Sequence, residues 1–333
     1  LPIMSQSKKL NADVTRSDLL MADGRTIRYY DSQGQVRSAA DQRPKEDQPG
    51  IGELRLDPLV NEWVVMAAHR QGRVFLPPKE LCPLCPTSGE LLTEIPDSNY
   101  EVVVFDNRSP SLRKPEGDWA APDMVGTETD SGTAAGKCEV ICFTDNHGGS
   151  FGELTAQRVR VLLEAWSDRV RELSLEPYIH HIAPFENRGE EVGVTLFHPH
   201  GQIYAYSYLP PRVQKMLAVA KLHFENTGRV LFDDVVAREL KDEDRIVAKN
   251  KHWVAFVPYA ARYPFEIHVA PVMPVADLAA LSPEQSDAFP EIALEVMRRL
   301  DGVFGIAMAY IATWHQAPVR EGRDLIRMHW QIT

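Results

Sequence analysis

Hydrophobic residues follow two different periods along the chain, and the change of period predicts the regular elements. Strand-like runs rich in Val, Ile and aromatic residues cover Glu62 to Ala67, Glu101 to Phe105, Cys138 to Phe143, Tyr178 to Glu186 and Val192 to Ser207. Between the third and fourth runs, apolar residues recur at helical spacing from Val159 to Leu173. This spacing predicts a long helix with one apolar face, and Thr155 is its expected N-cap.

The second half of the chain repeats this order. Its expected strands are His252 to Pro258, Phe265 to Ala270, Met308 to Trp314 and Leu325 to Ile332. A capping box at Ser282 to Gln285 opens a helix that runs to about Leu300 and contains Pro290. The repeated order predicts a duplicated unit with a pseudo-two-fold relation, in which His329-Trp330-Gln331 is a non-catalytic echo of His200-Gly201-Gln202.

The pattern divides the chain into three parts. Residues 1–50 are polar and lack a sustained period, which predicts an extended N-terminal arm. Residues 51–212 form the expected first half, and residues 213–333 form the expected second half. The fold class is therefore α+β.

Composition narrows the class of protein. Among 333 residues, 44% are hydrophobic and 25% are charged, as is typical of a globular protein. A net charge of −11 disfavours nucleic-acid binding, and no apolar run approaches the roughly 20 residues of a membrane helix. Four cysteines are too few for a disulfide framework, and the N-terminus has no signal pattern. These features predict a cytoplasmic enzyme.

The segment His198-Pro199-His200-Gly201-Gln202 lies inside an apolar, strand-like run. In a strand, the two histidines and the glutamine would share one face. Proline and glycine weaken an ordinary strand, which favours a functional site over two surface histidines in a turn. A neutral imidazole is a nucleophile at phosphorus and also a metal ligand, and an amide can donate to a phosphoryl oxygen.

A second candidate site is Cys82-Pro83-Leu84-Cys85. Its spacing suits two thiolates on one zinc ion or a redox dithiol. A redox pair normally opens a helix, whereas a loop-like Pro86-Thr87-Ser88-Gly89 follows here, which favours zinc. The candidates for the two further ligands are His147 and His198, with Cys138 and Cys142 as weaker candidates that are expected in the core.

Two polar segments complete the candidates. His69-Arg70-Gln71-Gly72-Arg73 carries two arginines that can hold a phosphate through forked hydrogen bonds, although alone it is more typical of a solvated loop. Phe185-Glu186-Asn187-Arg188-Gly189 is a turn between two strands, in which the asparagine and the last glycine can be simple turn residues.

Together these segments resemble the galactose-1-phosphate uridylyltransferase family of the histidine-triad superfamily. The resemblance is carried by Asp57-Pro58 to Glu62-Trp63, His69-Arg70 with Arg73, Cys82 with Cys85, Phe185 to Gly189, His198 to Gln202, and Trp314-His315 with Ala317-Pro318. It covers about residues 50 to 333. It implies two fused histidine-triad-like halves in one open, mostly antiparallel sheet with flanking helices, in agreement with the internal repeat.

The resemblance also implies a reaction. His200 would attack the α-phosphorus of UDP-glucose in a ping-pong exchange, Gln202 would hold the phosphoryl group, and galactose 1-phosphate would accept the uridylyl group. The implied ligands of one structural zinc are Cys82, Cys85, His147 and His198. The implied substrate-binding residues are Arg70, Arg73, Asn107, Asn187, Gly193, Thr195 and Gln202. The implied assembly is a homodimer with active sites at or near the subunit interface.

The chain departs from the family pattern in places. Some members have a second metal site, of which His315 fits one ligand, but Met216 stands at its glutamate position and the terminal histidine cluster is absent, so no iron is expected. Arg108 stands where an aspartate is often found in the uridine pocket. The chain stops at Thr333, before the usual tail of the family, so a missing tail is expected.

Two other functions remain open. One is a nucleotidyl-transferring phosphorylase of the same superfamily that acts on ADP-glucose or a dinucleoside polyphosphate. The other is a zinc-stabilised nucleotide-binding module without turnover.

Overall fold

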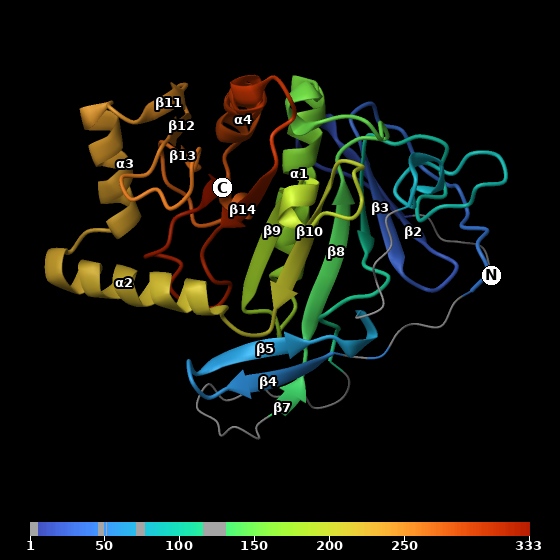
Figure 1. Ribbon diagram of the computed structural model, residues 1–333, viewed down its shortest axis with the longest axis horizontal. Helices are drawn as coiled ribbons and strands as arrows, with labels where there is room; N and C mark the ends of the chain where they lie inside the picture. The colour runs from blue at the N-terminus through green and yellow to red at the C-terminus, as the bar shows by residue number, and fades with distance from the viewer. Residues whose placement is uncertain (1–5, 46–49, 51, 71–76, 116–130) are drawn as a thin grey trace.

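The computed structural model describes residues 6–45, 50, 52–70, 77–115 and 131–333. Within these residues, twelve strands form one antiparallel sheet with the order β1-β2-β3-β6-β8-β10-β9-β14-β15-β13-β12-β11 (Figure 1). Its strands are β1 (Gln6–Lys9), β2 (Thr15–Leu20), β3 (Thr26–Asp31), β6 (Val102–Asp106), β8 (Gly136–Cys142), β9 (His181–Arg188), β10 (His200–Tyr206), β11 (Ile246–Lys249), β12 (Trp253–Phe256), β13 (Ile267–Pro271), β14 (Tyr310–His315) and β15 (His329–Ile332).

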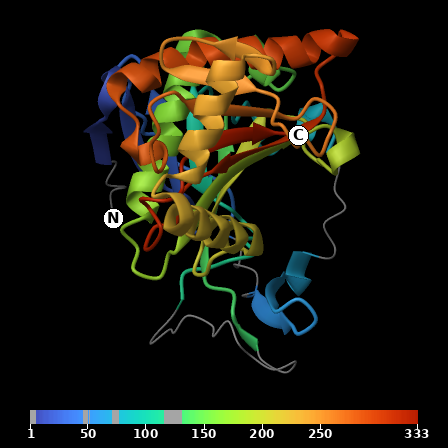
Figure 2. The same cartoon turned by 90° about the vertical axis from the view of Figure 1, so that its left-hand side faces the viewer.

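Helices and a small second sheet surround this framework. The helices are α1 (Ala156–Leu173), α2 (Pro211–Thr227), α3 (Leu231–Asp242) and α4 (Pro283–Phe304). The small sheet contains β4 (Glu53–Asp57), β5 (Glu62–Met66) and β7 (Ser131–Thr133), and it projects from the main body (Figures 1 and 2). No described helix combines the length and the apolar character that crossing a bilayer requires.

The strand order confirms the predicted duplication. The run β6-β8-β10-β9 is followed by β14-β15-β13-β12, which is the mirrored order of the matching strands. Strands β9 and β14 join the halves, with Phe185 opposite Thr313. The long helices α1 and α4 pack against each other over the same face of the sheet (Figure 1). The expected α+β fold with one open antiparallel sheet is therefore confirmed.

The predicted helix signals are present in the structure. The side chain of Thr155 accepts a hydrogen bond from the backbone N–H of Arg158, as an N-cap does. Ser282 and Gln285 form the reciprocal capping box at the start of α4. The apolar faces of both helices contribute to one core that also contains Trp314 and Trp330 of the sheet. This packing makes the two halves a single body around the β9–β14 junction.

Residues 6–31 do not form the polar arm that the sequence analysis expects over residues 1–50. They form β1, β2 and β3, and β3 pairs with β6 inside the main sheet. The segment is polar in sequence, yet it can form buried strands because its charged side chains are paired with opposite charges. Arg16 contacts Asp168 of α1 at 2.7 Å, and Arg37 contacts Asp31 at 2.6 Å. Burial of such charges requires partners, and the partner of Arg16 on α1 lies 152 residues away in the sequence.

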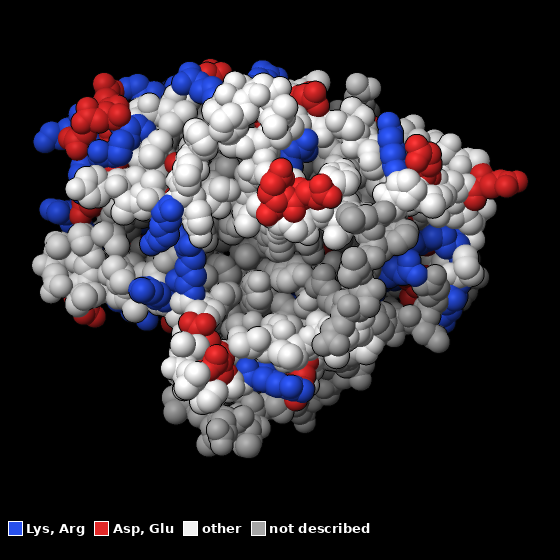
Figure 3. Space-filling model, in the orientation of Figure 1, with Lys and Arg blue, Asp and Glu red and all other residues white. Residues whose placement is uncertain are grey.

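Charges of both signs are interspersed over the described part of the face in Figure 3. This distribution gives no support to a nucleic-acid-binding surface on this face, since such surfaces gather Lys and Arg in one patch or stripe.

Candidate functional site

His200 is the first residue of β10, which lies between β8 and β9 near the middle of the twelve-stranded sheet. Residue 201 must be glycine, because a Cβ atom there would lie 2.6 Å from the carbonyl oxygen of Phe185 and 3.1 Å from the ring of Phe143. The close approach of β9 and β10 therefore depends on the glycine of the motif. It fixes the backbone that presents His200 and Gln202.

A backbone carbonyl fixes the imidazole of His200. Its Nδ1 atom lies 2.7 Å from the carbonyl oxygen of His198. A carbonyl can only accept, so Nδ1 carries the proton and Nε2 keeps its lone pair. Burial lowers the pKa of His200, which favours the neutral ring. The side chain is thus prepared to act as a nucleophile through Nε2.

A cavity of about 540 Å³ adjoins this histidine. Besides His200 and Gly201, it is lined by the predicted residues Asn107, Asn187, Gly193, Thr195 and Gln202. Its apolar lining comes from Phe105, Val140, Phe185, Val194 and Leu196. The structure therefore brings together, in one cavity, residues that lie far apart in the sequence. Such a mixture of apolar walls and a few polar groups is typical of small-molecule sites.

The amide of Gln202 is oriented inside this cavity. Its Oε1 atom accepts a hydrogen bond of 3.4 Å from Nδ2 of Asn107. This contact leaves the NH₂ group of Gln202 to donate to a ligand. Arg108 also lines the cavity and lies 3.7 Å from Glu94.

The side chains of the two predicted arginines lie outside the described part of the structure. Arg70 ends the short 3-10 helix Ala68–Arg70 that follows β5 in the small sheet, and its side chain lies outside the described part of the structure. Arg73 falls in the range 71–76, which is also outside it. The phosphate-binding role of both residues stays a prediction.

The four predicted metal ligands converge beside β10. One donor atom each from Cys82, Cys85, His147 and His198 lies within 4.8 Å of the other three. The Sγ atom of Cys85 is 3.4 Å from Nδ1 of His147 and 3.5 Å from Nδ1 of His198. In the described residues this is the one group of its kind that could hold a metal ion. Cys138 and Cys142 are not part of it and lie in apolar clusters, as expected.

The chemistry of these donors fits a tetrahedral cation. Zinc–sulfur bonds of about 2.3 Å and zinc–nitrogen bonds of about 2.0 Å place neighbouring tetrahedral ligands roughly 3.5 Å apart. Burial raises the pKa of Cys85 to about 12, and burial lowers the pKa of His198 to about 4. A partly buried thiolate needs a cation beside it, and a neutral imidazole is ready to coordinate one.

The matching strand of the second half has a different environment. His329 is stacked on Phe232 with ring centroids 4.6 Å apart, and Trp330 is stacked on Trp314 at 5.6 Å. Gln331 accepts from Arg212 and donates to Glu266, with distances of 2.8 and 2.7 Å. Aromatic packing therefore fills the second copy of the motif, which supports the prediction that it is a non-catalytic echo.

Three positions that the sequence compares with the family or with the first half have ordinary packing or polar partners in the second half. The Nε2 atom of His315 is 2.8 Å from Oε1 of Gln331, and Met216 packs among partly buried apolar residues. Arg327, at the position that matches His198, forms an ion pair of 3.0 Å with Asp233.

Tyr100 is not among the residues that the sequence predicts for the site. Its hydroxyl oxygen lies 2.7 Å from Nε2 of His198, although the two residues are 98 positions apart. Tyr100 precedes an ordinary buried strand, and no spacing in the sequence connects it to the motif. This contact becomes visible only in the folded chain.

Comparisons with known proteins agree with the site. The family model described as galactose-1-phosphate uridyl transferase, N-terminal domain, matches residues 42–210, and the C-terminal domain of the same name matches residues 217–333. A galactose-1-phosphate uridylyltransferase of Streptomyces lividans is 44% identical over 303 residues, which are 90% of this chain and 79% of that protein. One of Thermotoga maritima is 35% identical, over 81% of this chain and 82% of that protein.

Solved structures show the same architecture. A uridylyltransferase structure is 28% identical, with a TM-score of 0.71, and the alignment covers 84% of this chain and 85% of that chain. An ADP-glucose phosphorylase from Arabidopsis thaliana has a TM-score of 0.63 and is 22% identical, over 85% of this chain and 88% of that chain. At this identity the second structure shows a shared fold alone.

Proposed function

The chain belongs to the galactose-1-phosphate uridylyltransferase family, and we propose that it exchanges a uridylyl group between UDP-glucose and galactose 1-phosphate through a uridylyl-His200 intermediate. The observation that carries this proposal is the orientation of His200, whose Nδ1 is held by the His198 carbonyl while the ring adjoins the cavity. The polar lining by Asn107, Asn187 and Gln202 supports the same assignment.

The first step follows from this geometry. Nε2 of His200 forms a bond to the α-phosphorus of UDP-glucose, and the bond from that phosphorus to the bridging oxygen breaks. Glucose 1-phosphate leaves with the electron pair of the broken bond. The imidazole becomes cationic as the new bond forms, and the His198 carbonyl, 2.7 Å from Nδ1, stabilises that charge. Because imidazole is both a nucleophile and a leaving group, the intermediate can react further.

The second step reverses these roles. A phosphate oxygen of galactose 1-phosphate attacks the same phosphorus, the phosphorus–nitrogen bond breaks, and UDP-galactose forms. The NH₂ group of Gln202 donates to a phosphoryl oxygen in both steps, since Asn107 holds its other amide atom. Positioning and charge stabilisation of this kind supply most of the catalysis in phosphoryl transfer.

The proposed metal is one structural zinc ion held by Cys82, Cys85, His147 and His198. Two thiolates and two imidazoles at this spacing favour zinc over harder cations. When bound, the ion supplies a rigid cross-link rather than a reactive group. Its ligand His198 lies two residues before His200, so the cross-link fixes the start of β10.

Other parts of the proposal concern organisation. We expect two histidine-triad-like halves over residues 51–212 and 213–333, which the break between the two family matches supports. We also expect a cytoplasmic homodimer. Sedimentation of a fully active monomer at micromolar concentration would contradict the dimer.

Trapping the intermediate tests the function. Incubation with UDP-glucose and no acceptor should add one uridylyl group per chain, detected by intact-protein mass spectrometry. His200→Gly should lose the label, and His329→Asn, the matched change in the second half, should keep it. ADP-glucose should label poorly. Labelling that survives in folded His200→Gly, or turnover of ADP-glucose with inorganic phosphate but not of UDP-glucose, would overturn the proposal.

A further inference from the structure

Tyr100 lies between separate parts of the metal cluster. Its hydroxyl oxygen is 2.9 Å from the carbonyl oxygen of Leu84 and 2.7 Å from Nε2 of His198. Leu84 stands between the two cysteine ligands in the segment Cys82–Cys85, here called the cysteine loop. One hydroxyl group therefore contacts both the cysteine loop and a histidine ligand. Tyr100 is only 2% exposed, and water therefore cannot readily replace these contacts.

The contacts determine where the protons lie. The Leu84 carbonyl can only accept, so the hydroxyl of Tyr100 donates to it and keeps its lone pairs for His198. Nε2 of His198 is also 2.7 Å from the carbonyl oxygen of Thr144, which likewise only accepts. Nε2 therefore carries a proton, and the lone pair of the ring is on Nδ1. Nδ1 is the atom that lies 3.5 Å from Cys85 Sγ in the cluster.

The same contacts connect every segment that supplies a ligand. The cysteine loop is joined through Leu84, and β10 is joined through His198. The loop that carries His147 is joined through Thr144, three residues before that ligand. Each connection passes through the Nε2 proton of His198 or the hydroxyl of Tyr100.

We propose that Tyr100 is a positioning residue of the metal site, which fixes the cysteine loop against β10 and reinforces, beside the Thr144 carbonyl, the His198 tautomer that coordinates through Nδ1. The inference rests on the proposed metal but not on the proposed reaction. Partners of this kind, one step beyond the ligands, commonly change metal affinity by about 10–100-fold when they are removed.

The test is Tyr100→Phe, which removes one oxygen atom and keeps the ring. Zinc affinity, measured by competition with a chromophoric chelator, should fall by about 10–100-fold. The absorption bands of the Co²⁺-substituted protein should shift, because the geometry around the ion changes. Tyr29→Phe is the matched control. Tyr29 is buried in the same apolar cluster, and its hydroxyl accepts from the Asp97 backbone at 3.3 Å. The control should keep wild-type affinity and the wild-type Co²⁺ spectrum.

The outcomes separate the two levels of the proposal. A folded wild type that binds no zinc would overturn the metal site and this inference together. A Tyr100→Phe protein that binds zinc as tightly as wild type would overturn the inference alone, and so would equal losses in both variants. If Tyr100→Phe does not fold, ¹⁵N-histidine spectra of the zinc-loaded wild type decide. A proton on Nε2 of His198 that shows a cross-peak to a slowly exchanging Tyr100 hydroxyl proton supports the inference, and a proton on Nδ1, or a Tyr100 hydroxyl proton that exchanges freely with water, rejects it.

Discussion

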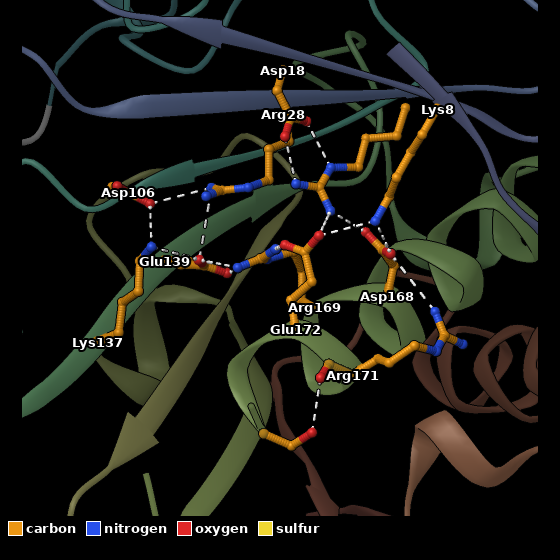
Figure 4. A network of polar contacts seen from close by, with 12 residues as sticks. Lys8, Asp18, Arg28, Asp106, Lys137, Glu139, Asp168, Arg169, Arg171 and Glu172 are labelled. Atoms are coloured by element: carbon orange, nitrogen blue, oxygen red, sulfur yellow. Dashed lines mark hydrogen bonds and ion pairs between the residues drawn. The ribbon is translucent and has the colours of Figure 1, made fainter. Parts of the chain in front are cut away.

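Replacing Arg169 with methionine removes one partner of a buried ion pair that joins helix α1 to strand β8 (Figure 4). The Nε and Nη2 atoms of Arg169 each donate to one carboxylate oxygen of Glu139 at 2.8 Å. The two side chains are 2% and 0% exposed. Arg169 also contacts Glu172. Glu139 has two more distant cations, Lys137 at 3.5 Å and Arg28 at 3.7 Å.

The expected cost follows from this geometry. Breaking a buried pair by removing one partner typically costs about 3–5 kcal/mol, because the remaining charge is left without full compensation. Lys137 and Arg28 still face Glu139 in the variant, so we expect Arg169→Met to lower the free energy of unfolding by about 3 kcal/mol at pH 7. The methionine keeps most of the apolar stem, which limits any packing loss.

The cost should depend on pH in one direction. Burial opposes ionisation of Glu139, but Arg169, Lys137 and Arg28 together hold its pKa well below the usual range. A carboxyl with a lowered pKa stabilises the fold above its unfolded-state pKa of about 4.5, and this contribution is lost as the pH falls through the folded pKa. The Arg169→Met variant lacks much of this stabilisation by the ionised Glu139 carboxylate. Its deficit relative to wild type should therefore be larger at pH 7 than at pH 4.

The assay is urea unfolding followed by tryptophan fluorescence at both pH values. Arg171→Met is the control, because Arg171 lies on the same helix, is 44% exposed and pairs with Asp168 at 3.6 Å. Asp168 is buried but keeps Arg16 at 2.7 Å and Lys8 at 3.1 Å, so loss of the largely exposed Arg171 should cost about 0–1 kcal/mol. Equal losses in the two variants, or an Arg169→Met deficit below about 1 kcal/mol at pH 7, would refute the assignment of a compensated buried charge.

Three further outcomes can be measured on the same protein. Gly201→Ala should abolish uridylyl exchange and lower the free energy of unfolding by about 1–3 kcal/mol, because the new Cβ would lie 2.6 Å from the Phe185 carbonyl; an active, equally stable variant would contradict this. Burial raises the pKa of Glu186 to about 8, so between pH 5 and 8 the carboxyl ionises in the unfolded chain but stays neutral in the fold. Wild type therefore loses stability as the pH rises toward 8. Glu186→Gln should therefore gain stability relative to wild type between pH 5 and 8, by about 1 kcal/mol or more in urea unfolding, and a constant difference would argue against a buried neutral carboxyl. Cys82→Ser/Cys85→Ser should contain no zinc by elemental analysis and unfold at lower urea concentration, whereas equal stability would show that the metal adds nothing to the fold.

Local signals explain what the sequence predicts well. Helix α1 has an uninterrupted apolar face and a capping threonine at Thr155, so its bounds follow from nearby residues alone. The expected strand from Val192 to Ser207 fails at its start, because Gly193 adopts a φ of +81° at the end of a 3-10 helix and the strand begins only at His200. Helix α2 buries only Val213, Leu217 and Ala220, and so few apolar contacts leave little pattern to detect.

Long-range contacts explain what the sequence misses. The sequence of β2 does not look like a buried strand, because it contains Arg16. This arginine can be buried because it pairs with Asp168, which only the completed fold brings close. Spacing predicts Cys82 and Cys85 as zinc ligands but leaves several histidines and cysteines as alternatives for the other two. The resemblance chooses among these and supplies the cavity residues. Neither spacing nor the resemblance indicates Tyr100, because its role depends on a contact with His198, which lies 98 residues away in the sequence.

The two halves share a backbone plan but differ at the residue that stands between the matched histidine and glutamine and faces the core. In the first half, Gly201 leaves space for the Phe185 carbonyl of β9 and for the ring of Phe143, and the cavity adjoins the same strand at His200 and Gln202. In the second half, Trp330 occupies the matching position and packs on Trp314, Phe289 and Phe151 in the shared core. A large aromatic side chain there contributes apolar burial that glycine cannot provide. Within the described residues, one copy of the strand thus adjoins an open cavity, while the other supplies packing that holds both copies together.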